Sequence, residues 1–367
     1  MRIYAVGGSV RDELLGRGAQ DRDFVVLQAS QEEFLARFPE AKQVGREHPV
    51  FIHQGREFTL SSSQHILDDL QKRDLTVNAL ARDEGGRCIS LPQSLSDLKQ
   101  GILRPVHRDN FFSDPLRAFR AARLAACLPQ FSVHPELKQA LQDLGRSSCL
   151  TGIAPERVGR EATKACACAR PGRFLRLLDD NGCLRGWFAP LAEAGHAARA
   201  SSLRMDARPA GEAAAVMDRV AGDALTVWMG LCHVFASLRQ DPVAVRAWCG
   251  KGASTAQRLG VSLRLPKRFI KAGEAAAGWI TAACHYLRLP AALRVELLLG
   301  LQARRLVQPM ARLVDAVAGV DLQDRLAGDL ELVLSVKLPP EERGRGARSG
   351  RILHRLRSRA LESTGGA

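Results

Sequence analysis

Two aspartates near the start of the chain have the spacing of a metal-binding pair. Asp21 and Asp23 precede the apolar run 24–27, which has the pattern of a strand. Because side chains alternate along a strand, both carboxylates are expected on one face. Such oxygen ligands suit Mg²⁺, and two ions about 3.5–4 Å apart could activate a 3′-hydroxyl and stabilise a leaving pyrophosphate. Glu57, at the start of a strand that could lie beside the first, is the candidate third carboxylate.

A glycine pair lies between a predicted strand, residues 2–6, and a predicted helix. Small residues at Gly8 and Ser9 would let a triphosphate approach backbone N–H groups at the positive end of that helix, where Arg11 would meet phosphate oxygens. Two glycines alone are also typical of a tight turn, and Asp-x-Asp is common by chance. Their order and proximity favour a nucleotide site. The chain has no Gly-x-x-x-x-Gly-Lys-Ser/Thr loop, which argues against a P-loop enzyme.

Asp114 and Arg117 are three residues apart at the predicted start of a helix, where both could reach one flat ligand. An aspartate accepts from an exocyclic amine and an arginine donates to ring acceptors, which fits cytosine, or adenine after a small rotation. Asp114 would equally suit a helix N-cap, with Pro115 in the first helical position. Arg120 and Arg123 continue the stripe and could contact phosphates, although surface arginines more often form salt bridges.

The elements that must position these residues begin as a mixture of strands and helices. Residues 50–53 and 57–60 flank Gln54 and Gly55, which predicts a hairpin. Together with the strands predicted at 2–6 and 21–27, this pattern indicates that the first hundred residues are mixed α/β.

From about Asp109 onward, apolar residues recur at spacings of three and four, which predicts a largely helical remainder. Residues 191–215 are Ala-rich and weakly periodic, as expected of a linker or mobile segment. Seven arginines between Arg343 and Arg359 are typical of a solvated or disordered tail that would add salt-dependent affinity for RNA.

Charge and length narrow the class of protein. Lys and Arg number 53 against 39 Asp and Glu, and the formal charge of +14 favours a polyanionic partner, with nucleic acid the leading candidate. Part of this excess follows from an Arg- and Ala-rich composition throughout the chain. A length of 367 residues with 46% apolar content predicts two or three compact units.

The cysteines and the N-terminus predict a cytoplasmic protein. Nine cysteines without a Cys-x-x-Cys pair indicate reduced thiols that line the core. Cys166 and Cys168 should point apart on a helix, so joint zinc ligation is not expected. The start of the chain lacks the apolar run of a signal peptide, and no segment approaches the ~20 apolar residues that span a bilayer.

Three segments together resemble one known family. The run Gly7 to Asp12, the Asp21-Arg22-Asp23 motif and the run Lys72 to Leu80 are similar to those of the class II tRNA nucleotidyltransferase and bacterial poly(A) polymerase family. The resemblance covers roughly residues 1 to 190. It implies an α+β fold with an N-terminal DNA polymerase β-like nucleotidyltransferase head followed by all-α neck and body domains. It also implies two Mg²⁺ ions, CTP or ATP as nucleotide substrate, and tRNA as partner.

The resemblance also assigns domains and residue roles. It implies a catalytic head over 1–108, a helical neck with the nucleotide-template helix over 109–190, a tRNA-binding body over 191–340 and an Arg-rich tail over 341–367. The run Lys72 to Leu80 corresponds to the second motif of the family. In this second motif, Arg73, Asp74 and Asn78 would contact the ribose and phosphates of the nucleotide, as their hydrogen-bonding groups allow.

The template helix departs from the family pattern at one position. Asp114 and Arg117 match the base-reading Asp and Arg of the family's Glu-Asp-x-x-Arg, but the leading Glu is Ser113 here. The family's Glu could help to hold the site, so the change affects how Arg117 is oriented. The segment 155–161 resembles a helix-opening segment that braces the template helix.

Two further departures bear on the reaction. Only eleven residues separate Leu60 from Lys72, where CCA-adding relatives carry a longer flexible segment that helps to switch from CTP to ATP. The short connection predicts CC addition, with the terminal adenosine supplied by a separate enzyme. In the C-terminal half, Cys232-His233-Val234 replaces the His-Asp pair of a metal-dependent phosphohydrolase, so no phosphatase activity is expected and His233 is interpreted as a core or surface residue.

Other functions remain open at this point. Full CCA addition is the first alternative, followed by an A-adding enzyme or a poly(A) polymerase. A catalytically inactive RNA-binding protein is the alternative from a different class, suggested by Ser113 and the changed C-terminal half. Retention of Arg11 and the other motif residues argues against an inactive protein.

Overall fold

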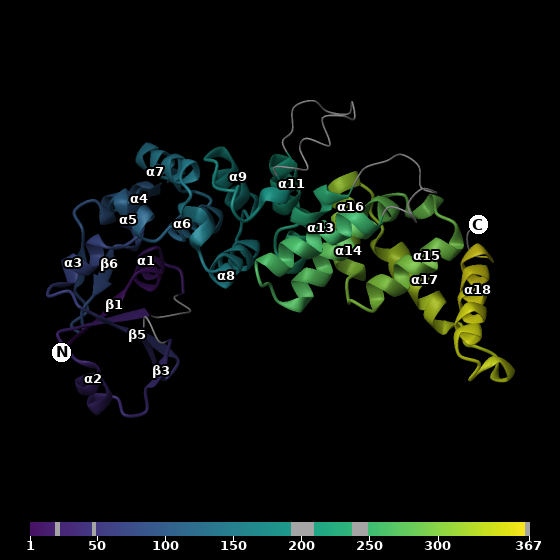
Figure 1. The fold of residues 1–367 in the computed structure, drawn as a ribbon, viewed down its shortest axis with the longest axis horizontal. Coiled ribbons are helices and arrows are strands. Elements are labelled where there is room, and N and C mark those ends of the chain that lie inside the picture. Colours follow the sequence, from purple (N-terminus) through teal and green to yellow (C-terminus); the bar gives the residue numbers. More distant parts are fainter. Residues whose placement is uncertain (19–22, 46–48, 192–208, 237–248, 364–367) are drawn as a thin grey trace. The chain divides into compact units, whose positions relative to one another are not determined.

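The structure, a computed structural model, describes residues 1–18, 23–45, 49–191, 209–236 and 249–363 (Figure 1). These residues form two compact units. The boundary between the units falls within helix α6 (Arg117–Cys127). The first unit is Met1–Ala121, Leu128–Gly152 and Asn181–Cys183, and the second is Ala122–Cys127, Ile153–Asp180 and Leu184–Ala367.

A seven-stranded mixed sheet organises the first unit. Its strand order is β3-β4-β5-β2-β1-β6-β7, in which β2 and β5 run parallel and the other neighbouring strands run antiparallel. Together with the helical remainder of the chain, this sheet confirms the predicted α+β class. The strands are β1 (Arg2–Val6), β2 (Asp23–Leu27), β3 (Lys42–Val44), β4 (Val50–His53), β5 (Arg56–Ser61), β6 (Leu80–Arg82) and β7 (Cys88–Ser90).

Short helices surround this sheet. A small parallel pair of strands, β8 and β9, also follows it, and the described elements after Asp109 are otherwise helices, as predicted. The elements are α1 (Gly8–Leu14), α2 (Gln31–Arg37), α3 (Ile66–Gln71), η1 (Thr76–Asn78), α4 (Ser94–Gln100), β8 (Ile102–Leu103), α5 (Asp109–Ser113), β9 (Ser132–Val133), α7 (Pro135–Arg146) and η2 (Cys149–Gly152).

The predicted hairpin is confirmed in β4 and β5. Gln54 and Gly55 connect the two strands with positive φ angles of 48° and 73°, the conformation that tight two-residue hairpin turns require. β2 was predicted to begin at Asp21. The described strand begins at Asp23, and Asp21 lies outside the described residues.

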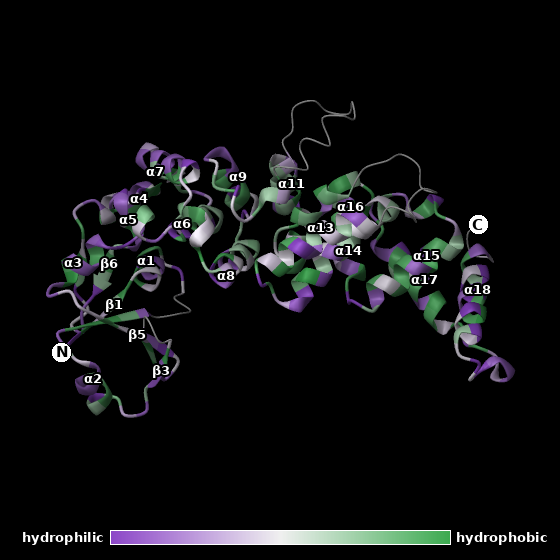
Figure 2. Cartoon of the chain, in the orientation of Figure 1, coloured by the Kyte–Doolittle hydropathy of each residue, from purple (hydrophilic) through white to green (hydrophobic). Residues whose placement is uncertain are grey.

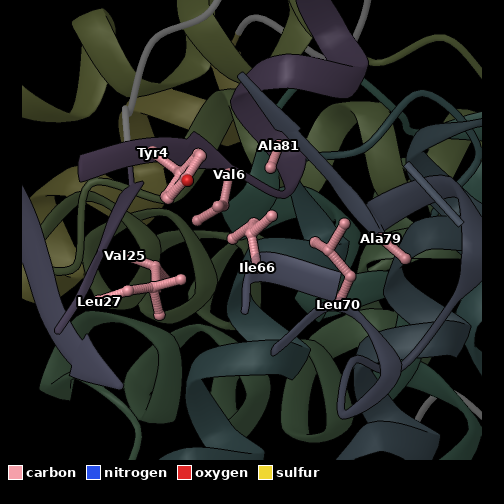
Figure 3. Close-up of a cluster of buried hydrophobic side chains, with 8 residues drawn as sticks. All are labelled: Tyr4, Val6, Val25, Leu27, Ile66, Leu70, Ala79 and Ala81. Atoms are coloured by element: carbon pink, nitrogen blue, oxygen red, sulfur yellow. The ribbon is translucent and has the colours of Figure 1, made fainter. Parts of the chain in front are cut away.

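Both faces of the sheet are packed, because side chains alternate along each strand. On one face, buried side chains of β1, β2 and β6 contact α3, whose Leu70 is fully buried. On the other face, Phe34 of α2 packs against Phe51 and Phe58. Figure 3 shows the members of the first cluster, which are Tyr4, Val6, Val25, Leu27, Ile66, Leu70, Ala79 and Ala81.

Within the described residues of the second unit, all regular elements are helices. In Figure 2, α15 is coloured mainly as hydrophobic, whereas α18 also carries hydrophilic segments. Besides the end of α6, the elements are α8 (Pro155–Cys166), α9 (Gly172–Asp180), α11 (Pro209–Arg219), α12 (Ala224–Cys232), η3 (His233–Phe235), α13 (Cys249–Ser262), α14 (Lys267–Cys284), η5 (Tyr286–Arg288), α15 (Ala291–Gln302), α16 (Val307–Ala318), α17 (Gln323–Ser335), η6 (Pro340–Glu342) and α18 (Ala347–Ser363).

Two predictions about the second unit are corrected by these helices. The linker predicted over 191–215 is helical from Pro209 onward, because alanines at 210, 213 and 214 are buried in α11; residues 192–208 lie outside the described residues. The predicted solvated tail is largely the helix α18, which packs against α15 and α17 and buries Leu361 completely.

The cysteine prediction is wrong for one pair. Cys127, at the end of α6, and Cys168, just after α8, are joined by a disulfide across 41 residues of sequence. Spacing along the chain could not reveal this pair, because the packing of two helix ends brings it together. Cys166, Cys183 and Cys232 are buried free thiols, as expected, and burial raises the pKa of each.

Two further observations concern the described residues only. His233 is buried and its Nδ1 lies 2.6 Å from the carbonyl oxygen of Gly230, in agreement with a core histidine. None of the helices described is both long enough and apolar enough to cross a membrane.

Candidate active site

Two carboxylates lie on neighbouring strands at one end of the sheet. Asp23 and Glu57 are partners in the parallel register of β2 and β5, so their side chains project from the same face. Neighbouring strands are about 4.8 Å apart. Both residues are exposed to solvent, and Val6, the partner of Asp23 in β1, directly precedes the glycine pair. The strand carrying Glu57 therefore does lie beside β2, as predicted.

This arrangement fits a divalent cation. Two exposed carboxylates at adjacent strand positions supply the oxygen ligands that Mg²⁺ prefers. Among the described residues no group of three or more acidic, histidine or cysteine side chains gathers as a metal site. The third predicted ligand, Asp21, lies outside those residues. The described chain therefore contributes two carboxylates, one from β2 and one from β5.

The glycine pair shapes the backbone beside these carboxylates. Gly7 has a φ of 75°, which favours glycine, and a Cβ there would lie 2.9 Å from Nη1 of Arg73. The hydroxyl of Ser9 donates to the carbonyl of Val6 and so fixes the start of α1. The glycine at position 7 thus permits a guanidinium to approach the loop that was predicted to cradle phosphates.

Arg11 is buried in a side-chain network. Its Nε and Nη2 donate to the carboxylate of Asp12 at 2.8 and 2.9 Å, and its Nη1 donates to Oδ1 of Asn78 at 2.7 Å. The predicted phosphate contact of Arg11 stays a prediction. In this structure the residue ties α1 to the second motif.

Asp74 is the centre of the same network. Its Oδ1 accepts from the backbone N–H of Leu75 and from Nδ2 of Asn78, and its Oδ2 accepts from Nε of Arg120 at 2.8 Å. Burial alone would raise the pKa of Asp74, but Arg120 and the hydrogen bonds hold this pKa well below its usual range. Asp74 is therefore a buried anion at neutral pH. It joins the second motif to α6, the predicted template helix.

Arg73 lies between the glycine loop and the template helix. Its Nη2 forms an ion pair with Asp69 of α3 at 3.1 Å, and its Nε is buried with no hydrogen-bond partner in the described chain. Its main-chain carbonyl accepts from Nη1 of Arg117 at 3.4 Å. A guanidinium beside Gly7 with an unused donor is suited to phosphate oxygens.

The template segment differs from the predicted geometry. Asp114 has an extended backbone after α5 and precedes α6 rather than sharing a helical face with Arg117, because Pro115 directly follows and disfavours a helical Asp114. The carbonyl of Asp114 still accepts from the N–H of Arg117 at 3.0 Å, which closes the turn that leads into α6. Asp114 thus caps the turn through its backbone.

The other two arginines of the stripe form ion pairs with buried carboxylates. Arg120 pairs with Asp74, as described above. In the second unit, Nε of Arg123 lies 2.5 Å from Oε2 of Glu161 in α8, which agrees with the expected bracing of the template helix by segment 155–161. The salt-bridge alternative considered for these residues is therefore observed, and their phosphate contacts stay predictions.

Sequence reasoning missed two residues of the site. Asp69 lies in α3, and Arg73 follows four residues later, just after the helix. This spacing could have indicated their ion pair. Asn110 of α5 donates from Nδ2 to the carbonyls of Gln71 and Arg73, each at 2.8 Å. Nothing in the local sequence signals that contact, because its partners are main-chain atoms almost forty residues away.

Comparison with known proteins agrees with this geometry. The family model of the poly A polymerase head domain matches residues 3–57. A multifunctional CCA protein of Xanthomonas campestris is 38% identical over 208 residues, or 50% of each chain. A CCA-adding enzyme of Coxiella burnetii is 34% identical over 204 residues, which are 50% of this chain and 54% of that protein.

Solved structures share the fold over nearly the whole chain. The Bacillus stearothermophilus CCA-adding enzyme in complex with CTP has a TM-score of 0.66 at 23% identity and covers 99% of this chain and 93% of that one. The Thermotoga maritima CCA-adding enzyme complexed with tRNA has a TM-score of 0.64 at 19% identity, covering 99% and 91%.

The segment that matches the poly A polymerase head domain includes the glycine loop and both strand-borne carboxylates, Asp23 and Glu57. Over about half of its length the chain is similar to a multifunctional CCA protein and a CCA-adding enzyme. It spans about half the length of the curated relatives it matches.

Proposed function

We propose that the protein adds CMP from CTP to the 3′ end of tRNA and releases pyrophosphate. The observation that carries this proposal is the placement of Asp23 and Glu57 at partnered strand positions beside the Gly7 loop. That the aligned relatives are CCA-adding proteins supports tRNA as substrate. A reaction on tRNA would place the protein in the cytoplasm.

The proposed mechanism assigns a role to each cluster. Asp23 and Glu57, with Asp21, would hold two Mg²⁺ ions, which would supply activation of the 3′-hydroxyl and charge neutralisation at the leaving pyrophosphate. Arg73 binds phosphate oxygens beside Gly7, and the buried Asp74 keeps the neighbouring main chain in place.

Base selection is assigned to Asp114 and Arg117. Burial lowers the pKa of Arg117, yet an arginine keeps its charge, so its fork still donates to the ring acceptors of cytosine. Asp114, in the segment between α5 and α6, would accept from the exocyclic amine. G and U present the opposite donor and acceptor pattern and are excluded.

Termination after two cytidines is supported by α3. The short connection between β5 and the second motif is occupied mainly by this helix, whose Ile66 and Leu70 belong to the buried core of the sheet. A packed helix does not offer the longer flexible segment that the family resemblance associates with the switch to ATP. The proposed product is therefore a CC end, and a separate enzyme would add the terminal adenosine.

One assay separates the candidate functions. The protein is incubated with Mg²⁺ and tRNA transcripts that end at the discriminator base, at C or at CC, with labelled CTP and ATP supplied singly and together. We expect products that stop at CC under all conditions. Adenosine on the CC-ended transcript would instead show full CCA or A addition, and tRNA binding without incorporation would indicate an inactive RNA-binding protein.

A further inference from the structure

The main-chain carbonyl of Arg73 accepts hydrogen bonds from two side chains. Nδ2 of Asn110 donates to it at 2.8 Å and Nη1 of Arg117 at 3.4 Å. The same Nδ2 also donates to the carbonyl of Gln71, the last residue of α3, at 2.8 Å. Asn110 thus holds the turn between α3 and the second motif from two points.

This contact lies where the chain lacks an acidic residue before Asp114. Ser113 occupies that position, and its hydroxyl donates to the carbonyl of Asn110 at 3.0 Å within its own helix. In the described chain Ser113 does not supply Arg117 with a hydrogen-bond acceptor. The carbonyl of Arg73 does, and its position depends on the amide of Asn110.

We infer that Asn110 is a positioning residue for nucleotide selection. It fixes the Arg73 carbonyl, which in turn anchors one corner of the Arg117 guanidinium and restricts the rotation of the other donors. Because the Arg73 side chain reaches Gly7, the same main-chain segment links base reading with phosphate binding. The inference rests on the proposed function, in which Arg117 reads the base.

Two substitutions at Asn110 separate hydrogen bonding from packing. Asn110→Asp keeps the side-chain shape but replaces the donor with an acceptor, and Asn110→Ala removes the group. Initial rates are measured with CTP and with UTP on a tRNA transcript ending at the discriminator base. Loss of orientation should lower kcat/KM for CTP by about 10- to 100-fold and lower the CTP-to-UTP ratio in both variants.

A second-site substitution distinguishes positioning from general loss of structure. Ser113→Glu in the Asn110→Ala background offers Arg117 a carboxylate acceptor, and we expect it to restore most of the CTP-to-UTP ratio. Gln100→Ala, which removes an exposed side-chain amide of the same unit, serves as the control and should leave the ratio unchanged.

The possible outcomes separate the two proposals. An active wild-type protein whose Asn110→Asp variant keeps the original CTP-to-UTP ratio would overturn the role of Asn110 alone. So would a double variant whose ratio stays at that of Asn110→Ala. A wild-type protein that incorporates no nucleotide would overturn the proposed function and, with it, this assignment.

Discussion

At the scale of single residues, the charged side chains of the candidate site differ in their exposure to solvent. Asp23 and Glu57 are exposed, so they are accessible to a cation and a nucleotide. Asp74 and Arg11 are buried and engaged by partners from other elements. The exposed carboxylates are therefore the candidates for chemistry, and the buried pair is better suited to holding the main chain in place.

Substitution of Asp23 should remove activity without unfolding the protein. Even outer partners of metal ligands cost 10- to 100-fold in metal affinity or activity, so Asp23→Ala should reduce CMP incorporation by more than about 100-fold. Glu57→Gln should do the same if it is the third carboxylate. The thermal unfolding midpoint is measured in parallel, with Glu32→Ala, an exposed carboxylate of α2, as control. Activity within tenfold of wild type in Asp23→Ala would refute the metal assignment.

A methyl group at Gly7 should displace the Arg73 guanidinium. Both Gly7 and Gly16 have positive φ, so alanine at either position costs about 1–3 kcal/mol of strain. Only at Gly7 would the new Cβ meet Arg73, because nothing lies within 4 Å of a Cβ at Gly16. We expect Gly7→Ala to raise KM for CTP and Gly16→Ala to leave it unchanged. Equal KM values in steady-state assays of the two variants would contradict a phosphate-binding role for Arg73.

At the scale of elements, local patterns predicted the parts of the head that depend on neighbouring residues. Strand alternation and the Gln54-Gly55 turn correctly indicated the hairpin, whose pairing is set by the turn itself. The extended conformation of Asp114 agrees with the N-cap alternative that Pro115 indicated, whereas a shared helical face with Arg117 is not observed.

Long-range packing explains the remaining differences from the sequence predictions. The helix at 209–219 and the helix α18 are stabilised by burial against other helices, which a weakly periodic or Arg-rich sequence does not reveal. The contacts of Asn110 and the Cys127–Cys168 disulfide likewise join residues far apart in the chain. Composition and periodicity carry no information on such pairs.

The role of α3 as a packed element can be tested with two leucines of the same helix. Leu70 is fully buried, whereas Leu67 is 44% exposed. Leu70→Ala should lower the free energy of unfolding by about 2–5 kcal/mol, and Leu67→Ala should change it by less than about 0.5 kcal/mol. Urea denaturation of both variants measures the difference. Similar small effects would mean that the connection is not held by the core.

The disulfide makes a prediction about the end of the template helix. Closing 41 residues between Cys127 and Cys168 restricts the unfolded chain, so Cys168→Ser should lower the free energy of unfolding by about 4 kcal/mol in the chain-entropy account. Cys149→Ser, at an exposed free cysteine, is the matched control. Reductant should lower the unfolding midpoint of the wild type but not of Cys168→Ser. A wild type insensitive to reductant would contradict the bond.

At the scale of the whole chain, the formal charge of +14 is concentrated in part on α18. Arg351, Arg355 and Arg359 recur every four residues, so they lie on one face of this helix, and all three are exposed. The described chain gives none of them an ion-pair partner, whereas Arg345 and Arg348 pair with Glu342. The helix packs on α15 and α17 and buries Ser358 and Leu361, which fixes the row of cations on a folded surface.

This row should contribute to tRNA affinity through phosphate contacts. Each phosphate neutralised adds about 0.7–0.9 to the slope of log K against log salt, so changing Arg351, Arg355 and Arg359 to Gln together should reduce that slope by about 2–3 and weaken binding at low salt. Filter binding of tRNA between 50 and 200 mM salt measures both quantities.

A control in which Arg258, Lys267 and Lys271 become Gln removes the same charge from exposed positions of α13 and α14. If the two triple variants lose equal affinity and slope, net charge alone attracts the tRNA. A larger loss in the α18 variant places the RNA backbone along this helix.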